Sequence, residues 1–246
     1  MVHFIGAGPG DPELLTIKGK KLIDQADVII YAGSLVNKEV LAGAKEGAEI
    51  YNSATMTLEE VIEVMKKAEA EGKMTARVHT GDPAVFGAHR EQMDELDRLG
   101  LAYEVCPGVS SFCGAAAALK AEYTLPNVSQ SVILTRMEGR TPVPEKEQIE
   151  SFAAHGATMV IFLSAGQLAR LSERLLAGGY TPDTPAAIVY KATWPDEKVV
   201  RTTVADLAEA GAREGITKTA LITVGGFLGN EYERSKLYDP TFTTEF

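Results

Sequence analysis

Three glycine-rich stretches in the first half of the sequence each follow an apolar run, and their residue types suit close contact with a ligand. They are Gly6–Asp11 (GAGPGD), Thr80–Asp82 (TGD) and Pro107–Gly108 (PG). Glycine lets the backbone approach a ligand without an intervening side chain. A helix that starts just afterwards offers unpaired N–H groups to polar atoms of the ligand. One such stretch alone is usually an ordinary turn, but three together indicate a shared crevice.

The first of these stretches differs from a dinucleotide-binding loop, which has the spacing G-x-G-x-x-G. Asp11 stands where the third glycine belongs, and Pro9 lacks a backbone donor for a phosphate. A dinucleotide fold also carries an acidic residue at the end of its second strand. Here the second apolar run, DVIIY, leads into Ala32-Gly33-Ser34. A nicotinamide oxidoreductase is therefore only a remote alternative.

The elements that must position these stretches alternate between strand and helix. Apolar runs predict strands at 2–7, 27–33, 47–52, 74–80 and 101–108. The intervening patterns predict helices at 12–26, 57–72, 85–100 and 109–121. The second of these helices has one apolar stripe, made of Leu58, Val61, Ile62, Met65 and Ala68. Continuous apolar strands separated by helices predict a parallel sheet covered on both faces, and such sheets bind ligands at the carboxyl ends of their strands.

The second half of the chain has a different rhythm. Strands are predicted at 130–136, 158–164, 186–193, 198–204 and 219–227, and helices at 147–155, 166–179 and 204–215. The spacing around WPDE, 194–197, predicts an antiparallel hairpin. We therefore expect an α/β fold with two α/β domains, the first mainly parallel and the second with a mixed sheet. The expected bounds are 1–121 and 129–246, joined by a linker at 122–128.

Composition excludes several classes of protein. A formal net charge of −10 disfavours a nucleic-acid binder, which usually carries a basic face. The apolar runs are too short to span a bilayer, and the first residues lack the pattern of a secretory signal. Cys106 and Cys113 lack metal-ligand spacing and are interpreted as free thiols. These features predict a cytoplasmic protein without a metal site of its own.

Six segments of the sequence, in order, resemble the tetrapyrrole methylase family. They are GAGPGDPELLTIKG, ADVIIYAGSLV, RVHTGDPAVFGA, PGVSSFCGAAAAL, EGRTPVPE and YKATWPDEKVVRTT. The resemblance covers nearly the whole chain and implies an S-adenosylmethionine-dependent enzyme with the cofactor in the cleft between two α/β domains. YAGSLV, ILTRMEGRTPVPE and KATWPDEKVVRTT resemble the branch that methylates C-11 of precorrin-4 in cobalamin biosynthesis. The tail YERSKLYDP is closer to the cobalt-precorrin-4 form.

This resemblance also implies which residues contact the cofactor, S-adenosyl-L-methionine, or its product S-adenosyl-L-homocysteine. They are Pro9, Thr80, Gly81, Asp82, Val85, Ser110, Ser111, Leu163, Ala192, Thr219 and Ala220. Leu163 stands where the family has methionine, and Ala192 where it has glycine. Because this cofactor has no phosphate, the missing third glycine and the missing donor at Pro9 have a chemical explanation.

An acidic precorrin substrate needs cationic partners, and planar arginine groups bind carboxylates well. Arg136 and Arg140 flank a Gly-Pro-rich loop. Without the resemblance they would be interpreted as solvated charges, and with it we expect substrate contact. His79 and His89 are weaker candidates, on position alone. No catalytic residue is identified: uroporphyrinogen methylases carry an acidic residue after the second-strand tyrosine, whereas Ala32 follows Tyr31 here.

Several alternatives stay open at this stage. Within the family they are methylation of uroporphyrinogen or another precorrin, a diphthine synthase-like activity, and methylation of ribosomal RNA ribose. The missing carboxylate after Tyr31 argues against uroporphyrinogen, and the acidic balance argues against RNA. From another class, a non-catalytic tetrapyrrole-binding module predicts binding without turnover. The family also implies a homodimer. The charge and the short apolar runs predict neither nucleic acid nor a membrane as a partner.

Overall fold

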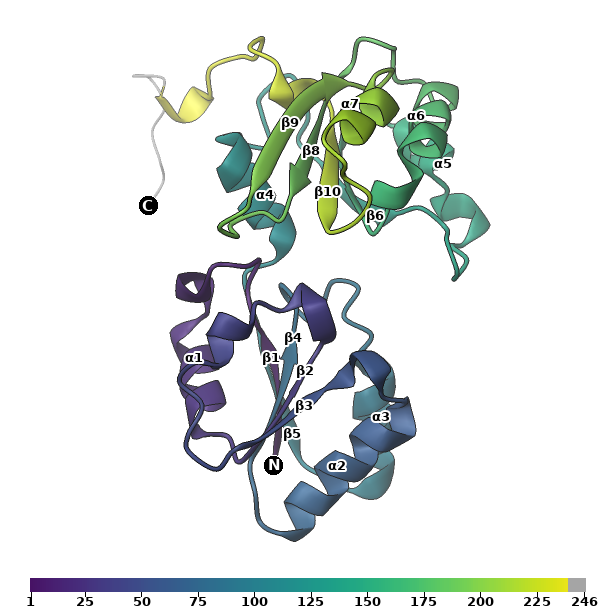
Figure 1. Cartoon of the computed structure of the whole chain (residues 1–246). Helices are drawn as coiled ribbons and strands as arrows, with labels where there is room; N and C mark the ends of the chain where they lie inside the picture. Colours follow the sequence, from purple (N-terminus) through teal and green to yellow (C-terminus); the bar gives the residue numbers. More distant parts are fainter. Residues whose placement is uncertain (239–246) are drawn as a thin grey trace. The chain divides into compact units, whose positions relative to one another are not determined.

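The structure, a computed structural model, describes residues 1–238 and divides into two compact units (Figure 1). Unit 1 comprises Met1–Gly114 together with the short segment Thr193–Pro195, and unit 2 comprises Ala115–Ala192 and the chain from Asp196 onward. The last eight positions of the predicted second domain, 239–246, lie outside the described residues, as does the end of the tail YERSKLYDP. No helix among residues 1–238 is both long and apolar enough to cross a membrane.

Unit 1 is built on a five-stranded parallel sheet in the order β3-β2-β4-β1-β5. Its strands are β1 (Val2–Gly6), β2 (Val28–Tyr31), β3 (Glu49–Asn52), β4 (Thr75–His79) and β5 (Tyr103–Cys106). Its helices are α1 (Ile17–Gln25), α2 (Leu58–Ala70), α3 (Arg90–Leu99) and the start of α4 (Ser111–Leu119). Single 3-10 turns lie at Pro12–Leu14, Gly33–Leu35, Lys38–Leu41 and Ser53–Thr55. The predicted parallel sheet is confirmed.

Both faces of this sheet are covered, as the continuous apolar strands predicted. Side chains alternate across it: Ile5 and Ile29 pack toward α1, whereas Phe4 and Ile30 pack toward α2 and α3. Figure 1 shows α1 on one side of the strands and α2 and α3 on the other. The predicted stripe of α2 is confirmed, since its members are buried or packed against that core. This packing therefore fixes the positions of the strand ends relative to one another.

Two helices of unit 1 are shorter than their sequence patterns predicted. The helix predicted at 12–26 is divided, because the Thr16 side chain accepts a hydrogen bond from Gly19 N and starts α1 anew at Ile17. The helix predicted at 85–100 begins only at Arg90. Phe86 and Ala88 have left-handed backbones, with φ of 54° and 46°, which a right-handed helix cannot contain.

Unit 2 is built on a mixed sheet in the order β6-β7-β10-β8-β9, in which only β6 and β7 are parallel. Its strands are β6 (Val132–Arg136), β7 (Thr158–Phe162), β8 (Pro185–Tyr190), β9 (Lys198–Thr203) and β10 (Ala220–Val224). Its helices are the remainder of α4, α5 (Ile149–Ala153), α6 (Leu168–Ala177) and α7 (Leu207–Arg213). Single 3-10 turns lie at Glu145–Glu147, Ala165–Gln167, Gly226–Leu228 and Lys236–Tyr238. The predicted mixed sheet and its β8–β9 hairpin are confirmed.

The core of unit 2 lies between this sheet and the helices α5, α6 and α7. Ile161, Ile188 and Ile222, from three neighbouring strands, are fully buried there with Leu171 of α6 and Leu207 of α7. Burying one such side chain contributes about 1.5–3 kcal/mol to folding. Packing of this kind fixes the ends of β6, β7 and β8 relative to the start of β10.

Candidate active site

In unit 1, the predicted glycine-rich stretches meet at the carboxyl edge of the parallel sheet. The loop after β1 and the loop after β4 pair through two backbone hydrogen bonds, from Gly81 N to Gly8 O at 2.9 Å and from Gly8 N to Gly81 O at 3.2 Å. The register places β1 between β4 and β5, so the loop after β5 lies at the same edge. This edge is where open α/β sheets bind ligands.

Glycine is required here because three backbones approach more closely than side chains allow. A Cβ on Gly6 would lie 2.6 Å from Gly108 Cα and 2.6 Å from Gly81 O. A Cβ on Gly108 would lie 2.3 Å from Gly81 O. Gly81 itself has a left-handed φ of +61°. The repeated glycines thus allow these loops to pack directly on one another.

Asp82 joins two of these loops through its carboxylate. Its Oδ1 accepts a hydrogen bond from Ala84 N at 2.7 Å, and its Oδ2 accepts one from Gly108 N at 2.8 Å. The Asp82 side chain caps the turn at 83–86. Charge-assisted hydrogen bonds of this kind are stronger than neutral ones. Asp82 therefore holds the loop after β5 against the loop after β4.

The other cofactor residues predicted in unit 1 lie at the same edge. Pro9 is buried in the loop after β1, and Thr80 and Val85 are half-buried in the loop after β4. Ser110 and Ser111 lie beside Gly81, since a Cβ there would be 3.5 Å from Ser110 Cα and 3.4 Å from Ser111 N. The fold thus brings together segments of sequence that are about 30 to 100 positions apart.

His79, at the end of β4, has its side chain inside unit 1, 2% exposed. Its ring centroid lies 6.0 Å from that of Phe4 and 5.8 Å from that of His89. Burial lowers the pKa of His79 to about 3, and the charges of Arg77 and His89 act in the same direction, against a hydrogen bond to the backbone of Gly87. Its Nε2 has no hydrogen-bond partner among the described residues. His79 is therefore neutral at pH 7.

Arg77, two residues before His79 on β4, is a buried cation that is 6% exposed. Its Nε donates to Gln92 Oε1 at 2.9 Å and its Nη1 donates to Ile30 O at 3.2 Å. Burial lowers its pKa to about 10. These hydrogen bonds join β4 to β2 and α3, so Arg77 has a structural role beneath the loop after β4.

In unit 2, the predicted residues Leu163, Ala192, Thr219 and Ala220 lie at one edge of the mixed sheet. The register pairs Ile222 with Ile161 and Ala220 with Tyr190, so the start of β10 lies beside the ends of β7 and β8. Arg136 ends β6 next to Phe162, at the same edge. The spacing of these residues in sequence did not indicate this proximity, which follows from antiparallel β10.

The backbone at this edge is strained. Leu163, Lys191 and Thr219 are non-glycine residues with left-handed φ values of 52°, 45° and 54°. Lys191 N donates to Thr219 O at 2.9 Å, which holds two of them together. Each such residue costs roughly 1–3 kcal/mol and persists only where the surroundings impose it. Leu163 is also 65% exposed, an unusual position for a large apolar side chain. Strain and exposure together favour a ligand contact here.

The two predicted substrate arginines have different surroundings. Arg136 donates to three carbonyl oxygens of the loop that follows it, those of Met137 at 3.1 Å, Thr141 at 3.2 Å and Pro142 at 2.8 Å. It therefore organises that loop. Arg140 is exposed within the same loop. Glu138 anchors the start of the loop by pairing with Arg170 and Arg174 of α6.

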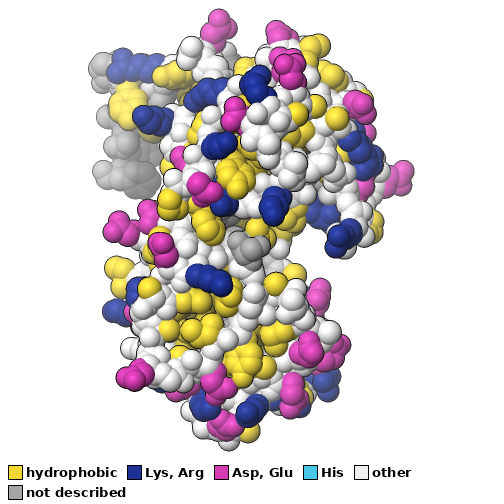
Figure 2. Space-filling model, in the orientation of Figure 1, with side chains coloured by type: hydrophobic (Ala, Val, Ile, Leu, Met, Phe, Trp, Pro, Cys, Tyr) yellow, Lys and Arg dark blue, Asp and Glu magenta, His cyan; other side chains and the backbone are white. Residues whose placement is uncertain are grey.

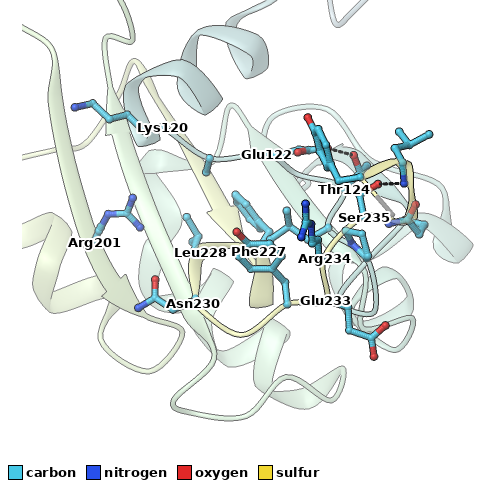
Figure 3. Close-up of a pocket in the computed structure, with 18 residues that line it drawn as sticks. Lys120, Glu122, Thr124, Arg201, Phe227, Leu228, Asn230, Glu233, Arg234 and Ser235 are labelled. Carbon is cyan, nitrogen blue, oxygen red and sulfur yellow. Dashed lines mark hydrogen bonds between the residues drawn. The ribbon is translucent and has the colours of Figure 1, made fainter. Parts of the chain in front are cut away.

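Unit 2 also carries an open groove of about 1290 Å³, shown in Figure 3. It is lined by residues of 120–130, by Arg201 and by residues of 227–238. Arg201 lies toward one end of the groove and Ser235 toward the other (Figure 3). Arg201 Nη2 donates to Leu119 O at 2.8 Å. Of the described residues that line this groove, none is a predicted cofactor residue.

Sequence reasoning missed the residues that hold the loop after β1. Asn37 Nδ2 donates to Gly10 O at 2.9 Å, and Asp11 N donates to Thr193 Oγ1 at 3.0 Å. Trp194 Nε1 donates to Pro9 O at 3.0 Å. These residues are 27 to 185 positions away from the atoms they bind. No local pattern could have identified them.

Neither surface charge nor a group of metal-ligating side chains indicates a further site in the described part of the chain. On the face drawn in Figure 2, acidic and basic side chains are interspersed rather than gathered by sign. Within residues 1–238, no group of three or more His, Cys, Asp and Glu side chains is arranged to hold a metal ion. Cys106 is buried and Cys113 exposed, and both are free thiols.

Two α/β units with glycine-lined and strained strand ends define a ligand-binding α/β protein. The family model for tetrapyrrole (corrin/porphyrin) methylases matches residues 1–208. The chain therefore belongs to the tetrapyrrole methylase family. The resemblance identified from the six sequence segments is confirmed.

Individual relatives span nearly the full chain. It is 56% identical over 246 residues to a cobalt-precorrin-4 C(11)-methyltransferase of Methanocaldococcus jannaschii, covering 100% of this chain and 95% of that protein. It is 46% identical to a precorrin-4 C(11)-methyltransferase of Sinorhizobium sp, covering 100% and 97%. The X-ray structure of a cobalt-precorrin-4 methyltransferase of cobalamin biosynthesis matches with 51% identity and a TM-score of 0.91, covering 93% and 96%.

A more distant structure carries a ligand. The uroporphyrin-III C-methyltransferase of Thermus thermophilus, solved with S-adenosylhomocysteine, is 29% identical with a TM-score of 0.77, and covers 92% of each chain. The two-sheet fold is therefore shared by family members with different tetrapyrrole substrates.

We predict that Gly108→Ala destabilises unit 1. The new Cβ would clash with Gly81 O, and neither atom can move without displacing a loop. Overpacking of this kind typically costs about 1–3 kcal/mol. Thermal unfolding followed by circular dichroism should show a lower Tm. The matched control is Gly139→Ala, where the nearest atom is Gln167 Nε2 at 3.8 Å. Equal Tm values for the two variants would contradict the close approach.

We also predict that the buried His79 makes stability fall in acid. The unfolded chain takes up a proton near pH 6.5, but the folded protein does so only near pH 3. Between these values the unfolded state binds more protons, so the free energy of unfolding decreases as the pH falls through this window. From pH 7 to pH 5 the loss due to His79 is at most about 2 kcal/mol.

The measurement is urea unfolding at both pH values for the wild type and for His79→Phe, which keeps an aromatic ring beside Phe4. The variant should lose less stability than the wild type over this interval. An identical loss in both proteins would show that His79 titrates normally.

Proposed function

We propose that this protein is an S-adenosylmethionine-dependent methyltransferase that acts on C-11 of (cobalt-)precorrin-4 in cobalamin biosynthesis and gives (cobalt-)precorrin-5. The observation that carries the proposal is similarity over the full chain to enzymes of this activity, at 46–56% identity. The two cobalt-precorrin-4 methyltransferases are 56% and 51% identical to this chain. The precorrin-4 methyltransferase of Sinorhizobium sp is 46% identical. We therefore favour the substrate that contains cobalt. The cobalt is part of this substrate and not of the protein.

The cofactor is proposed to bind at the predicted residues of unit 1. The loops there leave no room for side chains at Gly6 and Gly108, and Gly81 adopts a left-handed φ of +61° beside Ser110 and Ser111. Such a cradle fits an adenosine and an amino-acid group, which need shape and a few hydrogen bonds. When bound, S-adenosylmethionine supplies a methyl group activated by its sulfonium. Leu163, Ala192, Thr219 and Ala220 of unit 2 are proposed as further contacts.

The protein's own contribution to methyl transfer is proposed to be alignment. An in-line displacement on an activated carbon gains most from fixed positions of the two reacting groups and from exclusion of water. The interlocked loops of unit 1 supply rigidity: Gly8 pairs with Gly81, and Asp82 holds Gly108. The strained backbone at Leu163 and Thr219 fits the same requirement, since strain is retained where positions matter.

Substrate carboxylates are proposed to bind Arg140 rather than Arg136 or His79. The guanidinium of Arg136 already donates to three backbone carbonyls, and the His79 ring is buried and neutral. Arg140 is exposed in the loop that Arg136 organises. We further propose that the protein works in the cytoplasm as a homodimer, as the family implies.

Uroporphyrinogen methylation is the second candidate. A uroporphyrinogen-III C-methyltransferase of Bacillus subtilis is 34% identical over 238 residues, well below the precorrin-4 enzymes. The sequence Tyr31-Ala32-Gly33-Ser34 offers no carboxylate after the second strand. Both observations favour precorrin-4.

The decisive experiment is mass spectrometry of a single-turnover mixture. It contains the protein, methyl-labelled S-adenosylmethionine and precorrin-4 with or without cobalt, made by the preceding enzymes. We expect one labelled methyl on the cobalt form. Labelling of uroporphyrinogen in a parallel reaction, without labelling of either precorrin, would overturn the proposed substrate.

We predict that Arg140→Ala weakens binding of the tetrapyrrole and leaves binding of S-adenosylhomocysteine unchanged. Loss of a charge-assisted hydrogen bond costs about 1.5–3 kcal/mol, which is roughly a tenfold to hundredfold rise in KM for the tetrapyrrole. Steady-state kinetics and calorimetry measure the two quantities. Arg213→Ala, which removes an exposed arginine at the end of α7, is the control. A weaker cofactor affinity with an unchanged KM would contradict this role.

A further inference from the structure

The loop Gly8–Asp11 is held from outside at three consecutive residues. The Trp194 indole N–H donates to Pro9 O at 3.0 Å, and Asn37 Nδ2 donates to Gly10 O at 2.9 Å. The next N–H, that of Asp11, donates to Thr193 Oγ1 at 3.0 Å. Two residues of the loop also pair with backbone: Gly8 pairs with Gly81, and Asp11 O accepts a hydrogen bond from Leu14 N at 3.0 Å. Its conformation therefore depends on side chains that lie far away in sequence.

Packing around the loop is as close as its hydrogen bonds. A Cβ on Gly10 would lie 2.1 Å from Trp194 Cδ1, so the indole occupies the space that any side chain there would need. On the other side, a Cβ on Gly114 would lie 2.9 Å from Pro9 Cβ and 3.2 Å from Thr193 Cγ2. Pro9 is thus confined by helix α4 and by Thr193. Because Gly10 and Gly114 have no side chains, Trp194 and Pro9 can occupy this space.

The backbone of the residues that hold the loop is itself strained. Thr193 has a left-handed φ of 68°, and Lys191 just before it has one of 45°. For a threonine, which is β-branched, this conformation is an outlier. It places Thr193 Oγ1 on the loop and the indole of Trp194 over Gly10. The cost is retained because the contacts with the loop require this geometry.

We infer that Thr193 and Trp194 are positioning residues for methyl transfer, which fix the loop Gly8–Asp11 and with it Pro9 against the cofactor. This inference rests on the proposed function, because Pro9 is a proposed cofactor contact. Methyl transfer is sensitive to displacement of the reacting groups by about 1 Å. At Pro9 and Gly10 the loop is held by hydrogen bonds from Trp194 and Asn37, so its precision there depends on these external partners.

Trp194 also gives the inference a direct spectroscopic readout, since it is the only tryptophan in the sequence. The indole is half-buried and hydrogen-bonded to the peptide of Pro9. Its emission therefore depends on the state of the loop. Addition of S-adenosylhomocysteine should change the emission of the wild-type protein, with the same Kd that calorimetry gives.

The test compares wild type, Trp194→Phe and Thr193→Val. Phenylalanine keeps a ring over Gly10 but loses the donor to Pro9 O, and valine keeps the β-branch but loses the acceptor for Asp11 N. We expect each variant to retain the wild-type circular dichroism spectrum and to bind S-adenosylhomocysteine roughly fivefold to tenfold more weakly. The single-turnover rate at saturating cofactor should also fall, because misplacement persists once the cofactor is bound.

Tyr232→Phe serves as the matched control, since Tyr232 is an aromatic residue that is 60% exposed. It should leave both affinity and rate unchanged. If Trp194→Phe and Thr193→Val both keep the wild-type affinity and rate, the inference is wrong and the proposed function is not affected. Should Trp194→Phe fail to fold, Thr193→Val decides in the same way. Failure of the wild-type protein to bind S-adenosylhomocysteine would instead overturn the proposed function, and the inference with it.

Discussion

The close approach of three backbones at the carboxyl edge of the parallel sheet is the constraint on which the candidate site depends. Gly6, Gly81 and Gly108 come so near to one another that a single Cβ at either end of the group would touch backbone at 2.3–2.6 Å. This packing holds the loops after β1, β4 and β5 together, and the Asp82 carboxylate joins two of them by accepting a hydrogen bond from Gly108 N. A ligand that binds there meets main chain that is already in place, so little ordering cost remains at binding.

Unit 2 reaches a comparable rigidity by different means. Its site edge carries left-handed residues with side chains, at Leu163, Lys191 and Thr219, in place of glycines. Such a conformation needs compensation, and the core supplies it: Ile161, Ile188 and Ile222 fix the strands from which these residues project. The exposed side chain of Leu163 is then available for an apolar contact, which suits both a cofactor and a large tetrapyrrole ring.

The buried polar side chains beneath the site of unit 1 have structural roles and no chemical ones. Arg77 and His79 are adjacent on one face of β4, yet both are used internally, the first in hydrogen bonds to Gln92 and Ile30 and the second in ring contacts with Phe4 and His89. The two candidate arginines of unit 2 differ in the same way. Arg136 has a structural role, since it organises the loop by its hydrogen bonds, and Arg140 is exposed in that loop. Only the tertiary contacts distinguish these roles.

The sequence alone determined the two α/β domains, the sheet types, the hairpin around WPDE and the family. These follow from local periodicity and from segments such as GAGPGD and TGDPAVFG, which need no tertiary information. Helix starts were less well predicted, because Thr16 and the left-handed Phe86 and Ala88 end or delay helices within continuous apolar patterns. Tertiary structure alone decided how the site is held together. The partners of the loop Gly8–Asp11 come from Asn37, Thr193 and Trp194, and only folding brings side chains so distant in sequence within hydrogen-bond distance of one short loop.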